Sequence, residues 1–215
     1  KFKTDHKVLK IDESDYLKNL DDVLNYLDEP FADSSALAVY ILSKYVKNHV
    51  TVALSGDGAD EVFAGYNKYR AEYLLKSRPL AKQILKLAHP LSGMLPKSRD
   101  FKLANLGRQF HRLTQGAKLS DQERYFHWCR FVEKERVLNS LSPTLREQID
   151  EDEFSKRCGQ SLLLKEPKDF NQTLYNDVHY VLPNDMLVKV DLMSMANSLE
   201  VRVPFLNHKV VEFAF

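Results

Sequence analysis

The stretch VTVALSGDGADEVFAGY, residues 50–66, constrains the fold of this 215-residue chain more than any other. It begins with five apolar or β-branched residues, 50–54, without alternation of polar and apolar side chains. Such a run is typical of a strand covered on both faces, as in a parallel sheet. Two glycines and three acids, Asp57, Asp60 and Glu61, follow at once. Because an unpaired buried charge is costly, these carboxylates must be solvated, capped or coordinated.

Strand and helix patterns alternate around this stretch. HKVLKI (6–11) predicts a short strand, and apolar spacing over 16–27 and 36–48 predicts two helices. Apolar residues recur at helical intervals again from Val62 to about Ser77. This order is a βαβ pattern, so the acidic loop should lie at the carboxyl end of a parallel strand. Ligands bind at that end in open α/β sheets.

From residue 79 onward the strand signals fade, and we expect helices separated by 89–100, 114–122 and 139–144. The run RYFHWCRF, 124–131, mixes cations and aromatics, as single-strand nucleic-acid faces do. Its helical spacing favours instead an amphipathic helix docked by its aromatic side. The fold class predicted is α/β, predominantly helical with a small parallel sheet.

The charge balance argues against a nucleic acid or membrane partner. The chain has 31 Lys and Arg against 30 Asp and Glu, a formal charge of +1, so no overall field recruits a polyanion. No apolar run approaches the ~20 residues that span a bilayer. Two isolated cysteines, Cys129 and Cys158, fit core thiols in a reducing compartment, and we expect a cytoplasmic protein. The absence of an initial Met and the apolar end VVEFAF suggest an excerpt of a longer chain.

Three interpretations compete for the acidic loop. In the first, Gly56 and Gly58 form a tight turn and Asp57 or Asp60 caps the next helix. Calcium is disfavoured because an EF-hand needs alternating ligands over twelve residues, and this loop runs straight into an apolar helix. In the third, a nucleotide approaches the backbone of Ser55 and Gly56 closely, and a carboxylate of the loop holds magnesium. No Walker lysine follows, which excludes a P-loop ATPase. Spacing alone does not separate the cap from the nucleotide site.

A second constellation lies in LPNDMLVKVDLMSMANSLEVRVPFLNHKVVEFA, residues 182–214, where polar residues interrupt an apolar sequence. Glu200 and Arg202 are two apart, so on an extended segment they point to the same side. A buried ion pair that holds a helix end against the sheet is one interpretation of these two residues.

LSGDGADEVFAGY together with LPNDMLVKVDLMSMANSLEVRVPFL resembles the synthetase domain of the glutamine-dependent asparagine synthetase family. The upstream TDHKV and LDEPFADSSALAVYILS resemble it too. The resemblance covers most of residues 4–77 and 165–214, and the middle helices match only in being helical. It implies part of an adenine-nucleotide α-hydrolase-like (ATP-pyrophosphatase) fold. It divides the chain into a nucleotide-binding α/β part (1–77), a helical region (78–164) and a substrate-pocket segment (165–215).

The resemblance also implies a reaction. Such enzymes activate the side-chain carboxylate of aspartate with ATP and magnesium, forming an aspartyl-adenylate and pyrophosphate. Ammonia, released by a separate glutaminase domain, then gives asparagine and AMP. A homodimer is compatible with this family.

Site residues follow from the same resemblance. Ser55 and Gly56 are the expected nucleotide contacts, Asp60 the magnesium ligand and Asp57 a catalytic base. Glu200 and Arg202 would line or brace the substrate pocket.

Departures from the family pattern bear on activity. The pyrophosphate loop S-G-G-x-D-S and the glutaminase domain do not occur in these 215 residues, and Leu192 and Asn207 stand where Arg and Asp are usual. The chain alone is therefore expected to be inactive. Alternatives are an amidotransferase for another acyl acceptor, a non-catalytic module that keeps the fold, and, from the basic aromatic run, a nucleic-acid-binding module.

Overall fold

The computed structural model describes residues 3–96, 102–162 and 169–215. Two compact units make up the chain. Unit 1 comprises Lys1–Val62 with Tyr180–Phe215, and unit 2 comprises Phe63–His179. This division by contacts differs from the functional boundaries expected at residues 77 and 164, which stay a prediction.

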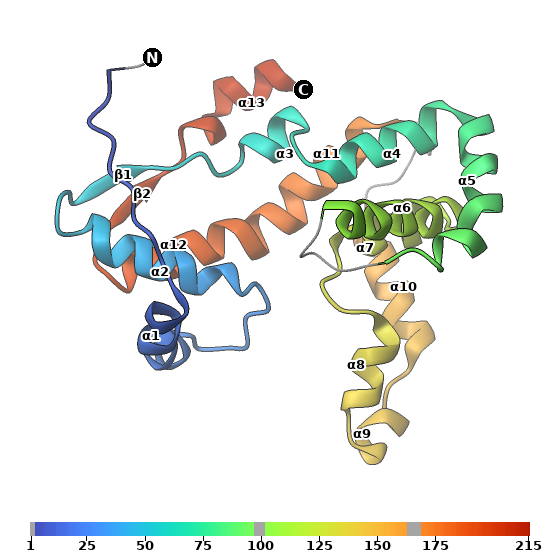
Figure 1. The fold of residues 1–215 in the computed structure, drawn as a ribbon, viewed down its shortest axis with the longest axis horizontal. Helices are drawn as coiled ribbons and strands as arrows, with labels where there is room; N and C mark the ends of the chain where they lie inside the picture. The colour runs from blue at the N-terminus through green and yellow to red at the C-terminus, as the bar shows by residue number, and fades with distance from the viewer. Residues whose placement is uncertain (1–2, 97–101, 163–168) are drawn as a thin grey trace. The chain divides into compact units, whose positions relative to one another are not determined.

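Unit 1 carries a two-stranded parallel sheet, β1 (Val52–Leu54) and β2 (Glu200–Arg202), seen side by side in Figure 1. Its helical elements are α1 (Glu13–Tyr26), α2 (Ser35–Val46), α3 (Ala59–Phe63), the π-helix η1 (Asp177–Met186), α12 (Leu187–Met195), the 3₁₀ turn η2 (Pro204–Leu206) and α13 (His208–Ala214); α3 and η1 straddle the chain boundaries with unit 2. The predicted class, mostly helical with a small parallel sheet, is confirmed.

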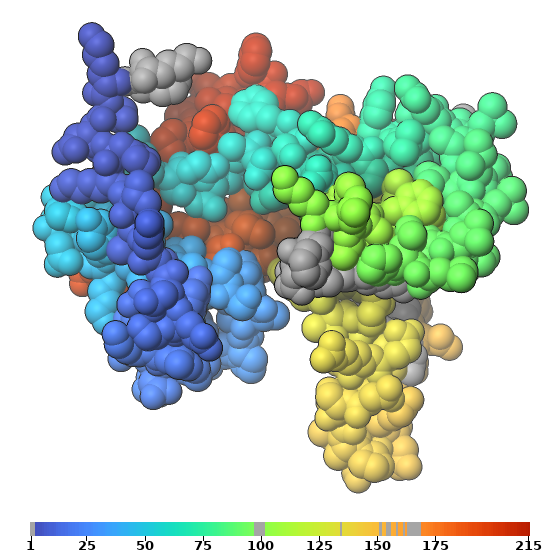
Figure 2. Space-filling model, viewed as in Figure 1, coloured from blue at the N-terminus to red at the C-terminus, as the bar shows by residue number. Residues whose placement is uncertain are grey.

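The parallel partner of β1 comes from the far end of unit 1's sequence. The register pairs Val52 with Glu200 and Leu54 with Arg202. The strand predicted at 6–11 is wrong: residues 3–12 contain no strand and run extended into α1, as Figure 2 shows in dark blue. Full coverage of β1 is also wrong, since Leu54 is 73% exposed. An apolar run without alternation indicates a strand, but it does not show that neighbours cover both faces.

The first two predicted helices are confirmed as α1 and α2. A capping box starts α1: the Asp12 side chain accepts from the Asp15 backbone N–H, and the Asp15 side chain accepts from that of Asp12. The helix predicted from Val62 to Ser77 is interrupted, because Ala64 has φ of 56° and ends α3. That left-handed backbone breaks a periodicity that continues in the sequence.

The core of unit 1 lies between α1, α2 and α12 and contains Val23, Tyr40, Ile41 and Met193.

An ion pair fastens α12 to the start of α2. The Lys189 Nζ lies 2.7 Å from Asp33 Oδ2, with side chains 9% and 13% exposed. Asp33 also accepts from the backbone N–H and hydroxyl of Ser35. Burial works against the charged carboxylate, but the hydrogen bonds from Lys189 and Ser35 lower the pKa of Asp33 overall.

Unit 2 is helical. Its helices are α4 (Asn67–Ser77), α5 (Pro79–Ser92), α6 (Lys102–Lys118), α7 (Asp121–Cys129), α8 (Lys134–Ser140), α9 (Pro143–Glu147), α10 (Glu151–Ser161) and α11 (Asn171–Asn176). Two of these helices extend further than predicted: α5 continues through Pro90, and α6 continues into the segment expected to be a loop at 114–122. Gly116 lies inside α6. It leaves room for Trp128, because a Cβ there would lie 2.5 Å from the indole.

The prediction that the basic and aromatic run docks by its aromatic side is confirmed only in part, because Arg124 and His127 are buried as well and Phe131 is 65% exposed. Tyr125 and Trp128 are buried, and Trp128 packs with Leu75 and Ala117. Among the described residues, no helix is long and apolar enough to cross a membrane.

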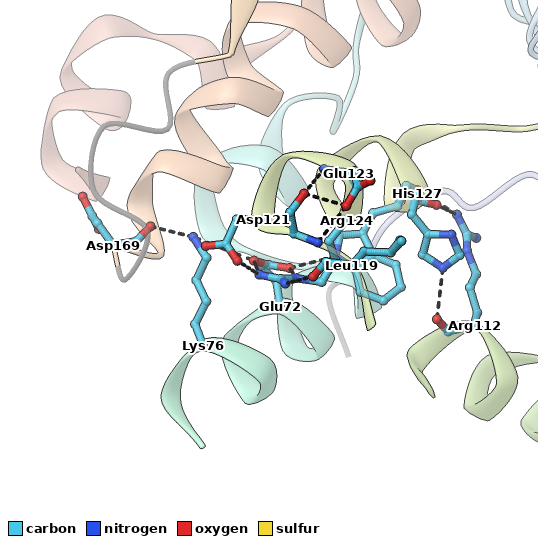
Figure 3. A network of polar contacts seen from close by, with 11 residues as sticks. Glu72, Lys76, Arg112, Leu119, Asp121, Glu123, Arg124, His127 and Asp169 are labelled. Carbon is cyan, nitrogen blue, oxygen red and sulfur yellow. Dashed lines mark hydrogen bonds and ion pairs between the residues drawn. The ribbon is translucent and has the colours of Figure 1, made fainter. Parts of the chain in front are cut away.

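Buried charges in unit 2 are paired. The Arg124 guanidinium makes two hydrogen bonds to Glu72, at 2.7 and 2.8 Å, and one to Asp121 at 2.6 Å (Figure 3). The Trp128 indole N–H donates to the same Glu72 carboxylate, and Lys76 lies 3.8 Å from it. Bidentate geometry of this kind is the strongest form of the arginine–carboxylate pair.

A second buried carboxylate, Asp177, accepts from the hydroxyls of Tyr69 and Tyr125 and pairs with Lys68 Nζ at 2.6 Å. Burial raises the pKa of the neighbouring Cys129 thiol to about 11. Cys129 is therefore an inert, partly buried thiol. The side chain of Cys158 lies outside the described residues.

The buried His127 ring makes two hydrogen bonds, one to a backbone carbonyl and one to a guanidinium. Its Nε2 lies 3.0 Å from the Arg112 carbonyl, and its Nδ1 lies 3.1 Å from Arg130 Nη2 (Figure 3 shows the Arg112 contact). A carbonyl only accepts, so Nε2 carries the proton and Nδ1 accepts. Burial lowers the pKa of His127 to about 4. The nearby cations Arg130 and Arg112 act in the same direction, whereas the hydrogen bond to the Arg112 carbonyl acts in the opposite one.

We expect His127 to make folding sensitive to mild acid. Between its ordinary pKa of 6.5 and about 4, the unfolded chain takes up a proton that the folded chain excludes, so stability falls as pH falls. At about 1.4 kcal/mol per pKa unit, His127 alone contributes at most about 3 kcal/mol of this loss. Urea unfolding between pH 7 and 4 should show a smaller loss for His127→Gln, whereas the exposed His208→Gln should behave as the original chain. Equal losses in His127→Gln and the original chain would contradict this assignment.

Candidate active site

The acidic loop leaves the carboxyl end of β1, where the sequence predicted it. The ladder continues one step past the strand, because the Ser55 N–H donates to the Arg202 carbonyl at 2.9 Å. Ser55 and Arg202 are thus neighbours, although they come from opposite parts of the sequence. This edge of the sheet, with the loop 55–60, is the candidate active site.

Two side chains of the loop contact each other directly. The Ser55 hydroxyl donates a hydrogen bond to Asp57 Oδ2. Both residues are partly exposed. A hydroxyl and a carboxylate held together at a strand end present oxygen atoms to any ligand at that end.

The two glycines of the loop have different roles. Gly58 has φ of +85°, and a Cβ there would lie 2.3 Å from the side chain of Leu206, so both backbone and packing require glycine. At Gly56 an added Cβ would meet no atom within 4 Å, and its φ is not in the left-handed region. The turn and the packing therefore explain Gly58 but not Gly56, whose missing side chain leaves its backbone open to a ligand.

Asp60 and Glu61 occupy the first turn of α3 but face different environments. Asp60 is exposed, whereas Glu61 is buried. The amides that begin α3 bond to the loop backbone, since the Val62 N–H donates to the Gly58 carbonyl at 3.0 Å. Asp60 is the second residue of α3 and lies past the N-cap position, so its place in the helix does not favour the helix-cap interpretation of this residue.

Glu200 and Arg202 point to the same side of β2, as their spacing predicted. Arg202 Nε lies 2.7 Å from Glu200 Oε1. The expected buried pair is wrong, however, because the two side chains are 53% and 66% exposed. An exposed pair of this kind adds little stability. Its position at the end of β2 leaves both groups accessible.

The loop presents carboxylate and hydroxyl oxygens, which are donors that could hold magnesium. The described residues contain no group of three or more His, Cys, Asp or Glu that could hold a metal. Magnesium with a nucleotide needs only one or two carboxylates, since phosphates and water complete its shell. The exposed Asp60, with Ser55 and Asp57 nearby in the loop, offers hard oxygen ligands of that type.

Two contacts of this region were missed by sequence reasoning. One is the Asp33–Lys189 pair, and the other is the packing of Leu206 on Gly58. Both join residues far apart in the sequence. Lys189 is one of the polar residues that interrupt the apolar sequence of 182–214, but nothing in the sequence indicated its partner.

Comparison with known proteins extends over the whole chain. Residues 1–215 match the model of the family described as asparagine synthase. The chain is 32% identical over 209 residues to Asparagine synthetase [glutamine-hydrolyzing] 1 of Bacillus subtilis, covering 95% of the chain and 30% of that protein. It is 32% identical over 214 residues to a putative asparagine synthetase [glutamine-hydrolyzing] of Mycobacterium tuberculosis, covering 97% of the chain and 30% of that protein.

A putative asparagine synthetase [glutamine-hydrolyzing] 2 of Methanocaldococcus jannaschii is 36% identical over 110 residues, covering 49% of the chain and 20% of that protein. No solved structure matches the chain significantly. The chain spans about 30% of the length of the first two relatives. Because the family model covers every residue, this chain belongs to the asparagine synthase family, whose domain has the adenine-nucleotide α-hydrolase-like fold.

Proposed function

We propose that, in the whole protein, this chain supplies the ATP-dependent site that converts aspartate to asparagine. The observation that carries the proposal is the position of the loop 55–60. It lies at the carboxyl end of a parallel strand, in a chain that matches the asparagine synthase family throughout. Open α/β sheets bind ligands at that end.

In the proposed reaction an oxygen of the aspartate side-chain carboxylate attacks the α-phosphorus of ATP, and pyrophosphate leaves. Ammonia, derived from glutamine in the whole protein, then attacks the acyl carbon of the aspartyl-adenylate, and AMP leaves. Adenylation replaces a poor oxide leaving group by AMP, which makes the second step feasible at neutral pH.

Each loop residue has a proposed part in these steps. The Ser55 hydroxyl and the open backbone of Gly56 contact the nucleotide. Asp57, aligned by its hydrogen bond from Ser55, accepts the proton that ammonia loses. Asp60 would hold magnesium, which neutralises charge on the phosphates when it is bound.

Glu200 and Arg202 are proposed to orient aspartate. Their exposure and their position beside the Ser55 end of the sheet support this role. Arg202 presents a guanidinium, the group best suited to bind a carboxylate. Glu200 pairs with the Nε of Arg202 and thereby fixes the direction of the guanidinium.

We expect Gly56→Ala to separate ligand approach from folding. The added methyl group meets open space, so the free energy of unfolding should change by less than about 1 kcal/mol, as for surface substitutions. In the whole protein the same change should raise the KM for ATP about tenfold or more. Gly58→Ala is the contrasting variant, since it should destabilise the fold. An unaltered KM for ATP in Gly56→Ala would argue against the nucleotide contact.

Asp60→Asn should slow asparagine formation by the whole protein about 10²-fold or more, the scale expected when electrostatic stabilisation of a transition state is lost. The magnesium concentration needed for half-maximal rate should rise as well. Asp28→Asn removes the same charge from an exposed position outside the site and serves as the control. Similar rates in the two variants would contradict the role of Asp60.

The 215 residues alone should form no asparagine from aspartate, ATP and ammonia, because the S-G-G-x-D-S loop is not among them. Product analysis by chromatography at high enzyme concentration tests this expectation. Turnover above the no-enzyme rate would show that a different segment binds pyrophosphate.

A further inference from the structure

Unit 2 contains an open cavity of about 500 Å³ lined by residues of α4 and α6 and by Trp128 of α7. All of its lining residues belong to unit 2. We propose that this cavity binds a small organic anion with an apolar body, such as an alkyl or aryl phosphate or carboxylate. The inference uses contacts within unit 2 only and does not depend on the proposed function.

The charged side chains that line the cavity are all cationic among the described residues. Its lining includes Lys68, Arg70, Arg108 and Arg112, and no carboxylate occurs among the described lining residues. Lys68 is neutralised by Asp177 behind it. The three arginines have no ion-pair partner within the part of the chain that the structure describes. An anion in the cavity would supply the missing counter-charge.

The hydrogen bonds of these arginines leave donors for a ligand. The Nε of Arg108 is buried without a hydrogen-bond partner, while its Nη2 donates to the Asn105 side chain at 2.9 Å. That Nε is closed to the cavity, so the donor that Arg108 leaves for a ligand is its Nη1, which makes no hydrogen bond among the described residues. Arg112 is held in place by the carbonyls of His127 and Trp128, each at 2.8 Å, and is thus preorganised.

Crowding of the guanidinium groups supports the same conclusion. Burial, and then the nearby cations Arg108 and Arg130, lower the pKa of Arg112. Arg130 has its own carboxylate partner, Glu133, but Arg108 does not. A bound anion would relieve this repulsion, and guanidinium groups bind phosphate and carboxylate with matched geometry.

The remaining wall selects for an apolar body. Leu74, Leu106, Phe110, Leu113 and Trp128 line the cavity together with the arginines. Cavities of about 300–1,000 Å³ with mostly apolar walls and a few placed polar groups are typical of small-molecule sites. Inorganic phosphate would pair with the arginines but would leave the apolar side chains uncovered. A neutral alcohol with an alkyl chain would cover the apolar side chains but would not pair with the arginines.

The chain offers a direct readout, because Trp128 is its single tryptophan and lines the cavity. Tryptophan fluorescence of the full 215-residue chain can be titrated with hexyl phosphate, hexanoate, inorganic phosphate and 1-hexanol. Hexyl phosphate or hexanoate should give a saturable change, and whichever binds more tightly identifies the head group. Inorganic phosphate and 1-hexanol should bind about tenfold more weakly or worse, equivalent to the loss of one favourable contact.

Variants locate the binding. Arg108→Gln and the exposed Arg70→Gln should each weaken binding of the better probe about tenfold, and both effects should shrink at high salt. Arg136→Gln removes the same charge from an exposed position on α8 and should leave the dissociation constant unchanged. Arg70→Gln keeps the test valid if Arg108→Gln folds poorly. Equal affinity for 1-hexanol and hexyl phosphate, or unchanged affinity in both cavity variants, overturns the proposal.

Discussion

The pairing of β1 with β2 is the constraint on which unit 1 depends. It joins residues 52–54 to residues 200–202 and thereby brings two distant parts of the sequence to one edge. The hydrogen bond from the Ser55 N–H to the Arg202 carbonyl extends this pairing to the first residue of the acidic loop. Without it, the loop and the Glu200–Arg202 pair would have no fixed relation, and neither group alone would form a site.

Polar interactions, and not only apolar packing, hold the helices in both units. In unit 1 the Asp33–Lys189 pair connects α2 with α12. In unit 2 Arg124 and Glu72 connect α7 with α4. Buried pairs with this many hydrogen bonds are costly to break singly, because the remaining partner is left as an unpaired charge. Each pair joins two helices that are distant in sequence.

Local patterns predicted the elements of the fold well. Helices α1 and α2, the strand at 52–54 and the loop after it all follow from apolar spacing and capping residues. The interruption at Ala64 could not be predicted, because an alanine in left-handed backbone leaves no trace in the periodicity. The false strand at 6–11 has the same origin: a short apolar run lacks information about whether a partner strand exists.

The residues proposed for the candidate site stood out in the sequence, and their roles stay a prediction; their arrangement was not predictable. Ser55, Asp57 and Asp60 stood out by their position after an apolar run, and resemblance to a family supplied their proposed roles. The contact between Ser55 and Asp57 and the exposure of Arg202 depend on tertiary structure. The arginine-lined cavity of unit 2 gave no signal, since its cations come from two helices and are unremarkable in sequence.

The packing of Leu206 on Gly58 has a consequence for how this region can evolve. The positive φ and this packing both require glycine at 58, so a side chain there would need a shifted turn as well as a smaller side chain at 206. Substitutions at the loop glycine and in the VPFL segment should therefore be correlated among relatives. Sequence drift in the second segment is limited by the backbone shape of the first, even where neither residue meets a substrate.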